Sequence, residues 1–144
     1  MKGKTSLLLM EQVAMILVFA IAAAVCLQAF ALSHDISREN EARSGAVRAA
    51  QNAAEVLKHC GDASAEAFSA AAEILGGEAK QDEYYANYDE NWNVTQHDAV
   101  YRLEAREVLS GVKGLVRVEV RVLTAEGEEL FSLPAAWQEV AYGG

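Results

Sequence analysis

A run of apolar residues near the amino terminus constrains the fold of this chain more than any other feature. From Gln12 to Leu32 there are 21 consecutive residues without a formal charge, and neither proline nor glycine interrupts them. A helix of about 20 apolar residues is long enough to cross the hydrocarbon core of a bilayer. The sequence therefore predicts a transmembrane helix.

Charges are distributed unequally on the two sides of this run. Lys2 and Lys4 precede it, whereas all but one of the 21 Asp and Glu residues follow it. Basic residues tend to stay on the cytoplasmic side of a span, so we expect a single-pass protein of the cell membrane with a cytoplasmic amino terminus and an extracytoplasmic carboxy-terminal domain. The acidic excess of that domain argues against direct nucleic-acid binding. A secretory signal peptide cut after Ala31 is the alternative.

The helical pattern continues beyond the span to about residue 60. Apolar residues recur here at spacings of three and four, at Val47, Ala50, Ala54 and Leu57. The polar residues Arg48, Gln51 and Glu55 lie on the opposite side of the predicted helix. We expect one helix with a transmembrane half, residues 7–33, and an amphipathic half, residues 34–60, that packs on its own domain.

Glycines mark two positions in this predicted helix. Gly45 lies inside the amphipathic half and is the expected bending point. Gly61 follows the last periodic residue, where a glycine commonly ends a helix.

Residues 61–144 are expected to form a small domain that begins with a short helix. Asp62 or Ser64 would cap the start of this helix, and Gly76 with Gly77 would end it. Its buried face would consist of Phe68, Ala71, Ala72 and Leu75. The predicted fold class is thus α+β.

Strands should follow, because the period of the apolar residues changes from 3.6 to 2. Apolar and polar residues alternate in residues 99–109 and 115–123, which predicts two half-buried antiparallel strands. A less regular strand is expected in residues 83–89, and another in residues 128–133 after a turn at Glu126-Gly127. Pro134 lacks an N–H group, so this last strand should end there or lie at a sheet edge.

The exposed faces of the two regular strands predict their register. Both have the order Arg-Glu-Arg, in the triplets Arg102-Glu104-Arg106 and Arg117-Glu119-Arg121. Like charges directly opposite one another are unfavourable in an antiparallel pair. We therefore expect Glu104 opposite Arg117, with a turn at Ser110-Gly111, or opposite Arg121, with a turn at Val112-Lys113, and not opposite Glu119.

The segment DENWNVTQHDAV is the nearest approach to a metal site. Asp89, Asn91 and Asn93 match the first ligand positions of a calcium loop, but Val94 and Val100 stand where the loop requires glycine and glutamate. A tight turn closed by Asx side chains is the better interpretation.

No other pattern predicts catalysis or a cofactor. The sequence contains neither a Ser-His-acid arrangement nor a cysteine pair at metal-binding spacing, so we expect no enzyme and no cofactor. Cys26 and Cys60 would lie about 50 Å apart on one helix, too far for a disulfide within the chain.

Glu11 is the exception within the apolar segment. A charge costs about 2.5 to 3.5 kcal/mol at the centre of a bilayer and less near its edge, so the helix can still insert. No Lys, Arg or His lies elsewhere in the span. The carboxylate therefore requires a partner from another molecule, the chain's own amino terminus, or protonation.

These amino-terminal residues resemble those of the type IV pilins and their pseudopilin relatives in type II secretion and DNA-uptake systems. The likeness lies in the basic leader MKGKTS, residues 1–6, the unbroken apolar helix, and Glu11 as the fifth residue after a cut between Ser6 and Leu7. Family leaders usually end in glycine, where this chain has Ser6. That difference, the absence of a helix proline and the two cysteines, which cannot form the usual carboxy-terminal disulfide of the family, favour a minor pseudopilin.

The resemblance implies a structural subunit of a filament. A prepilin peptidase would cut before Leu7, and Glu11 would pair with the new ammonium group of a neighbouring subunit. The implied partners are other pilin-like subunits, the peptidase, an inner-membrane assembly platform and the lipid bilayer.

An alternative function is an uncleaved, signal-anchored surface domain that binds a ligand or a partner protein. Its binding surface would be the sheet with an aromatic cluster of Tyr84, Tyr85, Tyr88 and Trp92.

Overall fold

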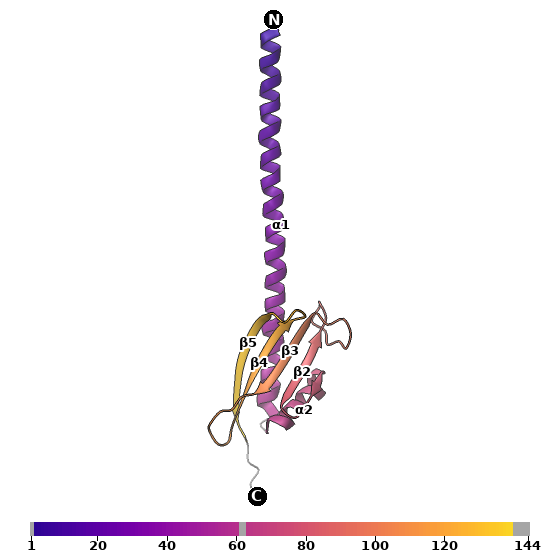
Figure 1. Ribbon diagram of the computed structural model, residues 1–144, viewed down its shortest axis with the longest axis vertical. Coiled ribbons are helices and arrows are strands. Elements are labelled where there is room, and N and C mark those ends of the chain that lie inside the picture. The colour runs from indigo at the N-terminus through magenta and orange to yellow at the C-terminus, as the bar shows by residue number, and fades with distance from the viewer. Residues whose placement is uncertain (1, 61–62, 140–144) are drawn as a thin grey trace. The chain divides into compact units, whose positions relative to one another are not determined.

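The computed structural model describes residues 2–60 and 63–139 (Figure 1). These residues form helices α1 (Lys2–Cys60) and α2 (Ser64–Leu75) and strands β1 (Glu78–Ala79), β2 (Glu83–Tyr88), β3 (Tyr101–Glu107), β4 (Leu115–Thr124) and β5 (Glu129–Gln138). The chain divides into two compact units, of which the first comprises the initial 41 residues and the second the remainder.

The amino-terminal unit is a single exposed helix, apolar over most of its length and polar in its last turns, residues 34–41. Every side chain described between residues 3 and 41 is exposed, and large apolar side chains such as Leu7, Phe19 and Phe30 are 71%, 76% and 77% exposed. Within the described residues, α1 is the helix long and apolar enough to cross a membrane. Soluble monomers rarely expose so much contiguous apolar surface, and a helix of this length and composition could span a membrane.

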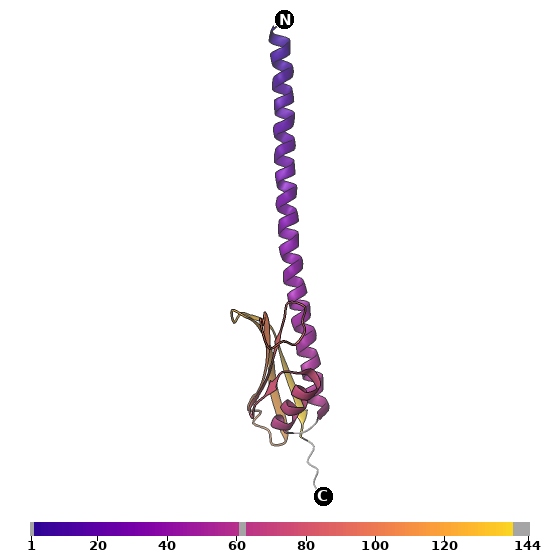
Figure 2. The ribbon, with the colours of Figure 1, turned by 90° about the vertical axis from the view of Figure 1, so that its right-hand side faces the viewer.

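The second unit has the predicted α+β arrangement. Its sheet has the order β1-β2-β3-β4-β5, and each pair of neighbours is antiparallel. Figure 2 shows the last part of α1 and α2 together on one face of the sheet. The four predicted strands are confirmed, whereas the two-residue strand β1 is too short to produce a period and was missed.

Small residues make up most of the face that α1 buries in the domain. Ala50, Ala54 and Leu57 are buried as predicted, but Val47 is only half-buried and Ala46 takes its place. The opposite positions Arg48, Gln51 and Glu55 are exposed, also as predicted. The sheet contributes the larger core side chains, which are Tyr84, Tyr88, Leu103, Val116, Val118, Val120, Val122 and Trp137.

Gly45 accommodates a neighbouring side chain. The helix continues without interruption through this residue, where the sequence predicts a bend. A Cβ at this position would lie 2.0 Å from Nε1 of Trp92. Trp92 in turn stacks on Tyr101, with ring centroids 4.2 Å apart and ring planes 3° from parallel. The glycine therefore makes room for the tryptophan.

The start of α2 differs from the prediction. Ala63 is the N-cap and provides no side-chain hydrogen bond, while its carbonyl accepts the N–H groups of Glu66 and Ala67. Ser64 is the first helical residue and not the cap, because its hydroxyl donates to the Glu107 carboxylate on β3. Asp62 and Gly61, the other predicted cap and stop, lie outside the described residues.

The end of α2 agrees with the prediction. Gly76 is the C-cap, with φ of 83°, and its N–H donates to the carbonyl of Ala72.

The buried face of α2 agrees with the prediction in part. Phe68 and Ala71 are buried as expected. Ala72 and Leu75 are only half-buried, and Ala67 is buried instead.

Pro134 lies inside β5 and does not end it. Of the two predicted outcomes, an early end is wrong and the edge position is confirmed. Glu139 N donates to Gly114 O at 2.9 Å, and alternate residues of an antiparallel strand direct their N–H groups to opposite sides. By that alternation the nitrogen of Pro134, which lies opposite Glu119, faces away from β4. The proline therefore removes no hydrogen bond between β4 and β5, and it leaves the free edge of β5 with one N–H donor fewer.

The register of β3 and β4 is one of the two predicted. Glu104 lies opposite Arg121, and Arg106 lies opposite Glu119. The predicted turn at Val112-Lys113 is wrong in position: a loop of residues 108–114 connects the strands, and its last turn is centred on residues 113–114, closed by the hydrogen bond from Leu115 N to Val112 O at 3.3 Å. The turn predicted at Glu126-Gly127 is present but lies one residue earlier, at residues 125–126, where Gly127 N donates to Thr124 O at 2.9 Å.

Candidate functional site

One face of α1 around Glu11 forms the first candidate site. A shallow depression on the helix surface is lined by Glu11, Ala14, Met15, Val18, Phe19 and Ala22. Residues three and four apart lie on the same side of a helix, so the carboxylate is aligned with two small alanines. This arrangement leaves room for another helix to approach Glu11.

Glu11 has no partner within the part of the chain that the structure describes. Neither a hydrogen bond nor an ion pair joins it to another of these residues. Lys4 lines a second depression together with Glu11, yet the two groups do not form an ion pair. The carboxylate is therefore available to a group from another molecule.

Ser6 and Leu7, the residues of the predicted cut, both lie within α1 and are exposed. Leu7 and Glu11 are four residues apart, which places them one turn apart on the same face of the helix. A peptidase acting here would have to unwind the first turns of the helix.

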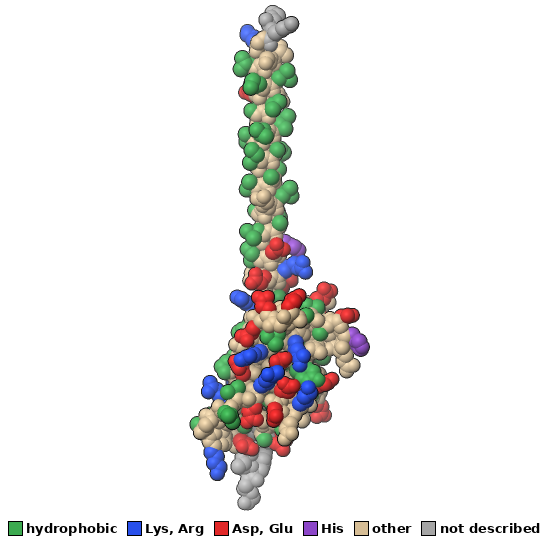
Figure 3. Space-filling model, viewed as in Figure 1, with side chains coloured by type: hydrophobic (Ala, Val, Ile, Leu, Met, Phe, Trp, Pro, Cys, Tyr) green, Lys and Arg blue, Asp and Glu red, His purple; other side chains and the backbone are tan. Residues whose placement is uncertain are grey.

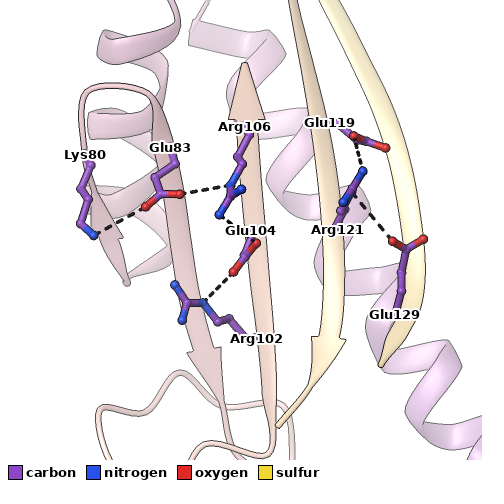
Figure 4. A network of polar contacts seen from close by, with 8 residues as sticks. All are labelled: Lys80, Glu83, Arg102, Glu104, Arg106, Glu119, Arg121 and Glu129. Carbon is purple, nitrogen blue, oxygen red and sulfur yellow. Dashed lines mark hydrogen bonds and ion pairs between the residues drawn. The ribbon is translucent and has the colours of Figure 1, made fainter. Parts of the chain in front are cut away.

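The outer face of the sheet carries a network of ion pairs (Figure 4). Glu83 lies 3.5 Å from Lys80 and 3.2 Å from Arg106, while Glu104 lies 3.6 Å from Arg106 and 3.1 Å from Arg102. The Arg102 Nε approaches this carboxylate without hydrogen-bond geometry. Three cations share two carboxylates here, so these ion pairs link β2 with β3 and leave this part of the face with a small positive excess.

A second group of ion pairs lies toward the free edge of the sheet. Arg121 donates to Glu119 at 2.9 Å, and its Nε lies 3.8 Å from Glu129 on β5. The hydrogen bond with Glu119 is the main cause that raises the pKa of Arg121.

The aromatic cluster proposed as a ligand surface is divided between two faces. Tyr84 and Tyr88 point into the core, and burial raises the pKa of both phenols. Tyr85 points to the outer face, where the Arg102 guanidinium lies 4.8 Å from its ring centroid. Trp92 packs over Gly45, so the four side chains do not form one binding surface.

A polar cleft of about 330 Å³ lies between β2 and the loop that follows it. It is lined by Gly77, Glu78, Tyr85, Asn87, Val94, Thr95, Gln96 and His97. The Tyr85 hydroxyl donates to Glu78, and the Thr95 hydroxyl donates to the His97 carbonyl at 2.6 Å. Sequence reasoning missed this cleft, because its lining comes from three separate segments.

The predicted Asx turn is confirmed beside this cleft. One carboxylate oxygen of Asp89 accepts the N–H groups of Asn91 and Asn93, each at 2.9 Å. These hydrogen bonds lower the pKa of Asp89, that from Asn93 most of all. Across the described ranges, no three His, Cys, Asp or Glu residues are grouped closely enough to hold a metal ion.

These features differ in the chemistry that they can perform. The unpaired carboxylate of Glu11 can meet a cation from another chain, the ion-pair network stabilises the sheet, and the polar cleft can accept a small polar group. Comparisons with protein-family models, curated proteins and solved structures found no significant match for this chain.

Proposed function

We propose that this chain is a structural subunit, a minor pseudopilin, of a membrane-anchored filament related to type IV pili. The observation that carries the proposal is Glu11, an unpaired carboxylate on a helix whose apolar surface is exposed throughout. A charge placed inside a membrane needs a partner, and an exposed apolar helix needs lipid or other chains around it. Assembly of several such helices meets both needs.

In this proposal a prepilin peptidase cuts between Ser6 and Leu7. The new ammonium group of one subunit pairs with Glu11 of the next, and both charges are neutralised in surroundings of low dielectric constant. Small residues on the helix permit close helix-to-helix packing; they are Ala14, Ala20, Ala22, Ala23 and Ala24. Assembly takes place in the cell membrane, on an inner-membrane platform and among other pilin-like subunits.

The charge distribution supports an orientation for the subunit. Lys2 and Lys4 precede the apolar helix, and the acidic domain follows it. The amino terminus is then cytoplasmic, and the domain that contains the sheet is extracytoplasmic. The domain contributes contacts to the filament and no catalysis.

The assembly role can be tested by co-isolation. Tagged and untagged copies of the full chain are produced together with a prepilin peptidase, and the untagged copy recovered with the tag is measured. Removing one partner of a buried ion pair costs about 3 to 5 kcal/mol, so Glu11→Ala should lower recovery at least about tenfold while membrane insertion persists. Gln12→Ala is the matched control. Undiminished recovery of the Glu11→Ala chain would contradict the proposal.

A second candidate function is the uncleaved, signal-anchored surface domain. The polar cleft favours it, because Glu78, Asn87 and Gln96 offer a carboxylate and two amides to a ligand. Intact-mass measurement separates the two functions. Membrane-extracted chains from cells with the peptidase should lack residues 1–6 if the chain is a pseudopilin and retain them if it is an anchored binding domain.

A further inference from the structure

The loop between β3 and β4 presents apolar side chains to solvent. We name residues 108–115 the hairpin tip. Leu109 is 96% exposed and Val112 is 59% exposed, and Val108 and Leu115 are exposed to a smaller extent. Lys113 is the charged residue of this segment. An exposed apolar group of this kind is typical of a contact surface.

Hydrogen bonds hold the hairpin tip in one conformation. Ser110 Oγ lies 3.0 Å from Val112 O and 2.8 Å from Leu115 O, and it accepts the N–H of Val112 at 3.3 Å. Gly111 and Gly114 adopt positive φ values of 68° and 80°, which suit glycine. A loop already ordered before contact loses little conformational entropy when it docks.

The opposite end of β3 has complementary properties. We name residues 89–100 and 125–128 the acidic end, because they include five acidic residues and no Lys or Arg; the acids are Asp89, Glu90, Asp98, Glu126 and Glu128. Val94 and Val100 are 44% and 38% exposed here. Seven residues of β3 separate the two ends by roughly 23 Å. Figure 3 shows basic and apolar side chains at the tip of the loop, while acidic side chains are spread over the domain.

We propose that the hairpin tip of one copy of this chain docks on the acidic end of a second copy. Leu109 and Val112 would cover Val94 and Val100, while Lys113 would face carboxylates. The two surfaces lie at opposite ends of the same sheet, so the contact is heterologous and repeats from copy to copy along a line. This contact rests on the proposed filament function and adds to it a head-to-tail interface between the globular domains.

Charge makes the other pairings of these surfaces less favourable. Two hairpin tips in contact would bring Lys113 against Lys113, and two acidic ends would bring carboxylates together. The tip-to-end pairing alone places opposite charges and apolar groups together.

Cysteine cross-linking of the full chain in membranes tests the contact. In a Cys26→Ala, Cys60→Ala background, Leu109→Cys and Val100→Cys are combined and treated with a short bis-maleimide. We expect a ladder of dimers, trimers and larger species, since each copy carries one cysteine at each end. Neither single variant should form the ladder. Val112→Cys with Val94→Cys provides a second pair should the first disturb the fold.

A charge reversal measures the electrostatic part. In the cross-linking background, Lys113→Glu should reduce the ladder about twofold to fivefold, as expected for an ion pair at a partly exposed interface. An unchanged ladder would overturn the role of Lys113 in the contact.

The remaining outcomes separate this contact from the filament itself. Absence of a ladder from both cysteine pairs, or dimers from Leu109→Cys alone, would overturn the head-to-tail contact. If co-isolation still depends on Glu11 in that case, the filament function stands without this interface. A ladder that persists although co-isolation is independent of Glu11 would support the contact and contradict the proposed helix assembly.

Discussion

Gly45 illustrates how contact with a residue distant in sequence can explain which amino acid stands at one position. Glycine in a helix interior costs about 1 kcal/mol relative to alanine, so its presence needs a reason. The reason is Trp92, whose ring fills the space that a side chain at this position would occupy. Trp92 itself has a positive φ of 63°, and its ring stacks on that of Tyr101.

Gly45→Ala should therefore destabilise the domain, although the same change usually stabilises a helix. Displacing a packed side chain costs about 1 to 3 kcal/mol, which exceeds the gain in helix propensity. Near-ultraviolet circular dichroism during thermal unfolding measures the change. Ser44→Ala is the matched control, because Ser44 is the preceding residue of the same helix and its side chain is exposed. In a Trp92→Ala background, Gly45→Ala should become neutral or stabilising; continued destabilisation would refute the steric explanation.

Asp89 is a second residue whose role can be tested, through pH. Its pKa is lowered in the folded state by hydrogen bonds from Asn93 and Asn91. A lowered folded pKa means that the ionised group contributes stability above its unfolded pKa, about 3.9, and that this contribution is lost as pH falls through the folded pKa.

We expect Asp89→Asn to be less stable than the parent chain at neutral pH, with a difference that shrinks as pH falls below about 4. Asparagine retains the acceptor oxygen but not the charge, so it isolates the titration. Asp89→Ala removes the acceptor as well and should be less stable at every pH. Urea unfolding at a series of pH values measures these differences. A difference between parent and Asp89→Asn that grows on acidification would contradict the assignment.

At the scale of elements, the pairing of β3 with β4 connects surface charge to register. The observed offset places Glu104 opposite Arg121 and Arg106 opposite Glu119, as charge alternation predicts. Each such pair contributes only a few tenths of a kcal/mol, so the pairs favour one register over another only slightly. Burial of the valines decides which side chains of β4 face the core, because a shift by one residue would expose them.

Glu104→Gln should lower the free energy of unfolding by about 0.5 to 1 kcal/mol, and added salt should reduce the effect. The Glu104 side chain is only 17% exposed and lies between Arg102 and Arg106. Glu129→Gln is the control, since its side chain is 47% exposed and lies 3.8 Å from Arg121; its effect should be near zero. Urea unfolding at low and high salt compares them. If both variants lost the same free energy of unfolding, the prediction that the less exposed Glu104 contributes more than Glu129 would be wrong.

At the scale of the whole molecule, the chain combines a domain with its own core and a helix that has no core. The domain buries apolar side chains from α1, α2 and the sheet, whereas residues 3–41 are exposed throughout. Such a division is expected of a chain whose two units meet different surroundings, one apolar and one aqueous.

The proposed orientation predicts which side of the membrane the domain occupies. In a Cys60→Ala chain, Ser132→Cys introduces a thiol on the exposed face of β5. A membrane-impermeant maleimide should label it in right-side-out vesicles and label it in inside-out vesicles only after detergent is added. Native Cys26, within the apolar helix, is the internal control and should stay unlabelled in intact vesicles. Labelling confined to inside-out vesicles would reverse the orientation.

The sequence alone determined the features that depend on neighbours along the chain. The apolar run predicted the long helix, the alternation of Val116 to Val122 predicted a half-buried strand, and the charge triplets limited the register to two choices. Glu11 was recognisable for the same reason, because a charge among apolar residues is visible without a structure. Each of these signals is local and repeats with the period of its own element.

Only the tertiary structure decided the features that join distant segments. Gly45 meets Trp92, Ser64 donates to Glu107 in place of capping its helix, and the polar cleft combines residues from Gly77 to His97. The exposure of Leu109 belongs to this group as well, since a leucine in a loop is as compatible with a buried position as with a free one. Periodicity states which face a side chain occupies, but only the packing of one element on another states what that face meets.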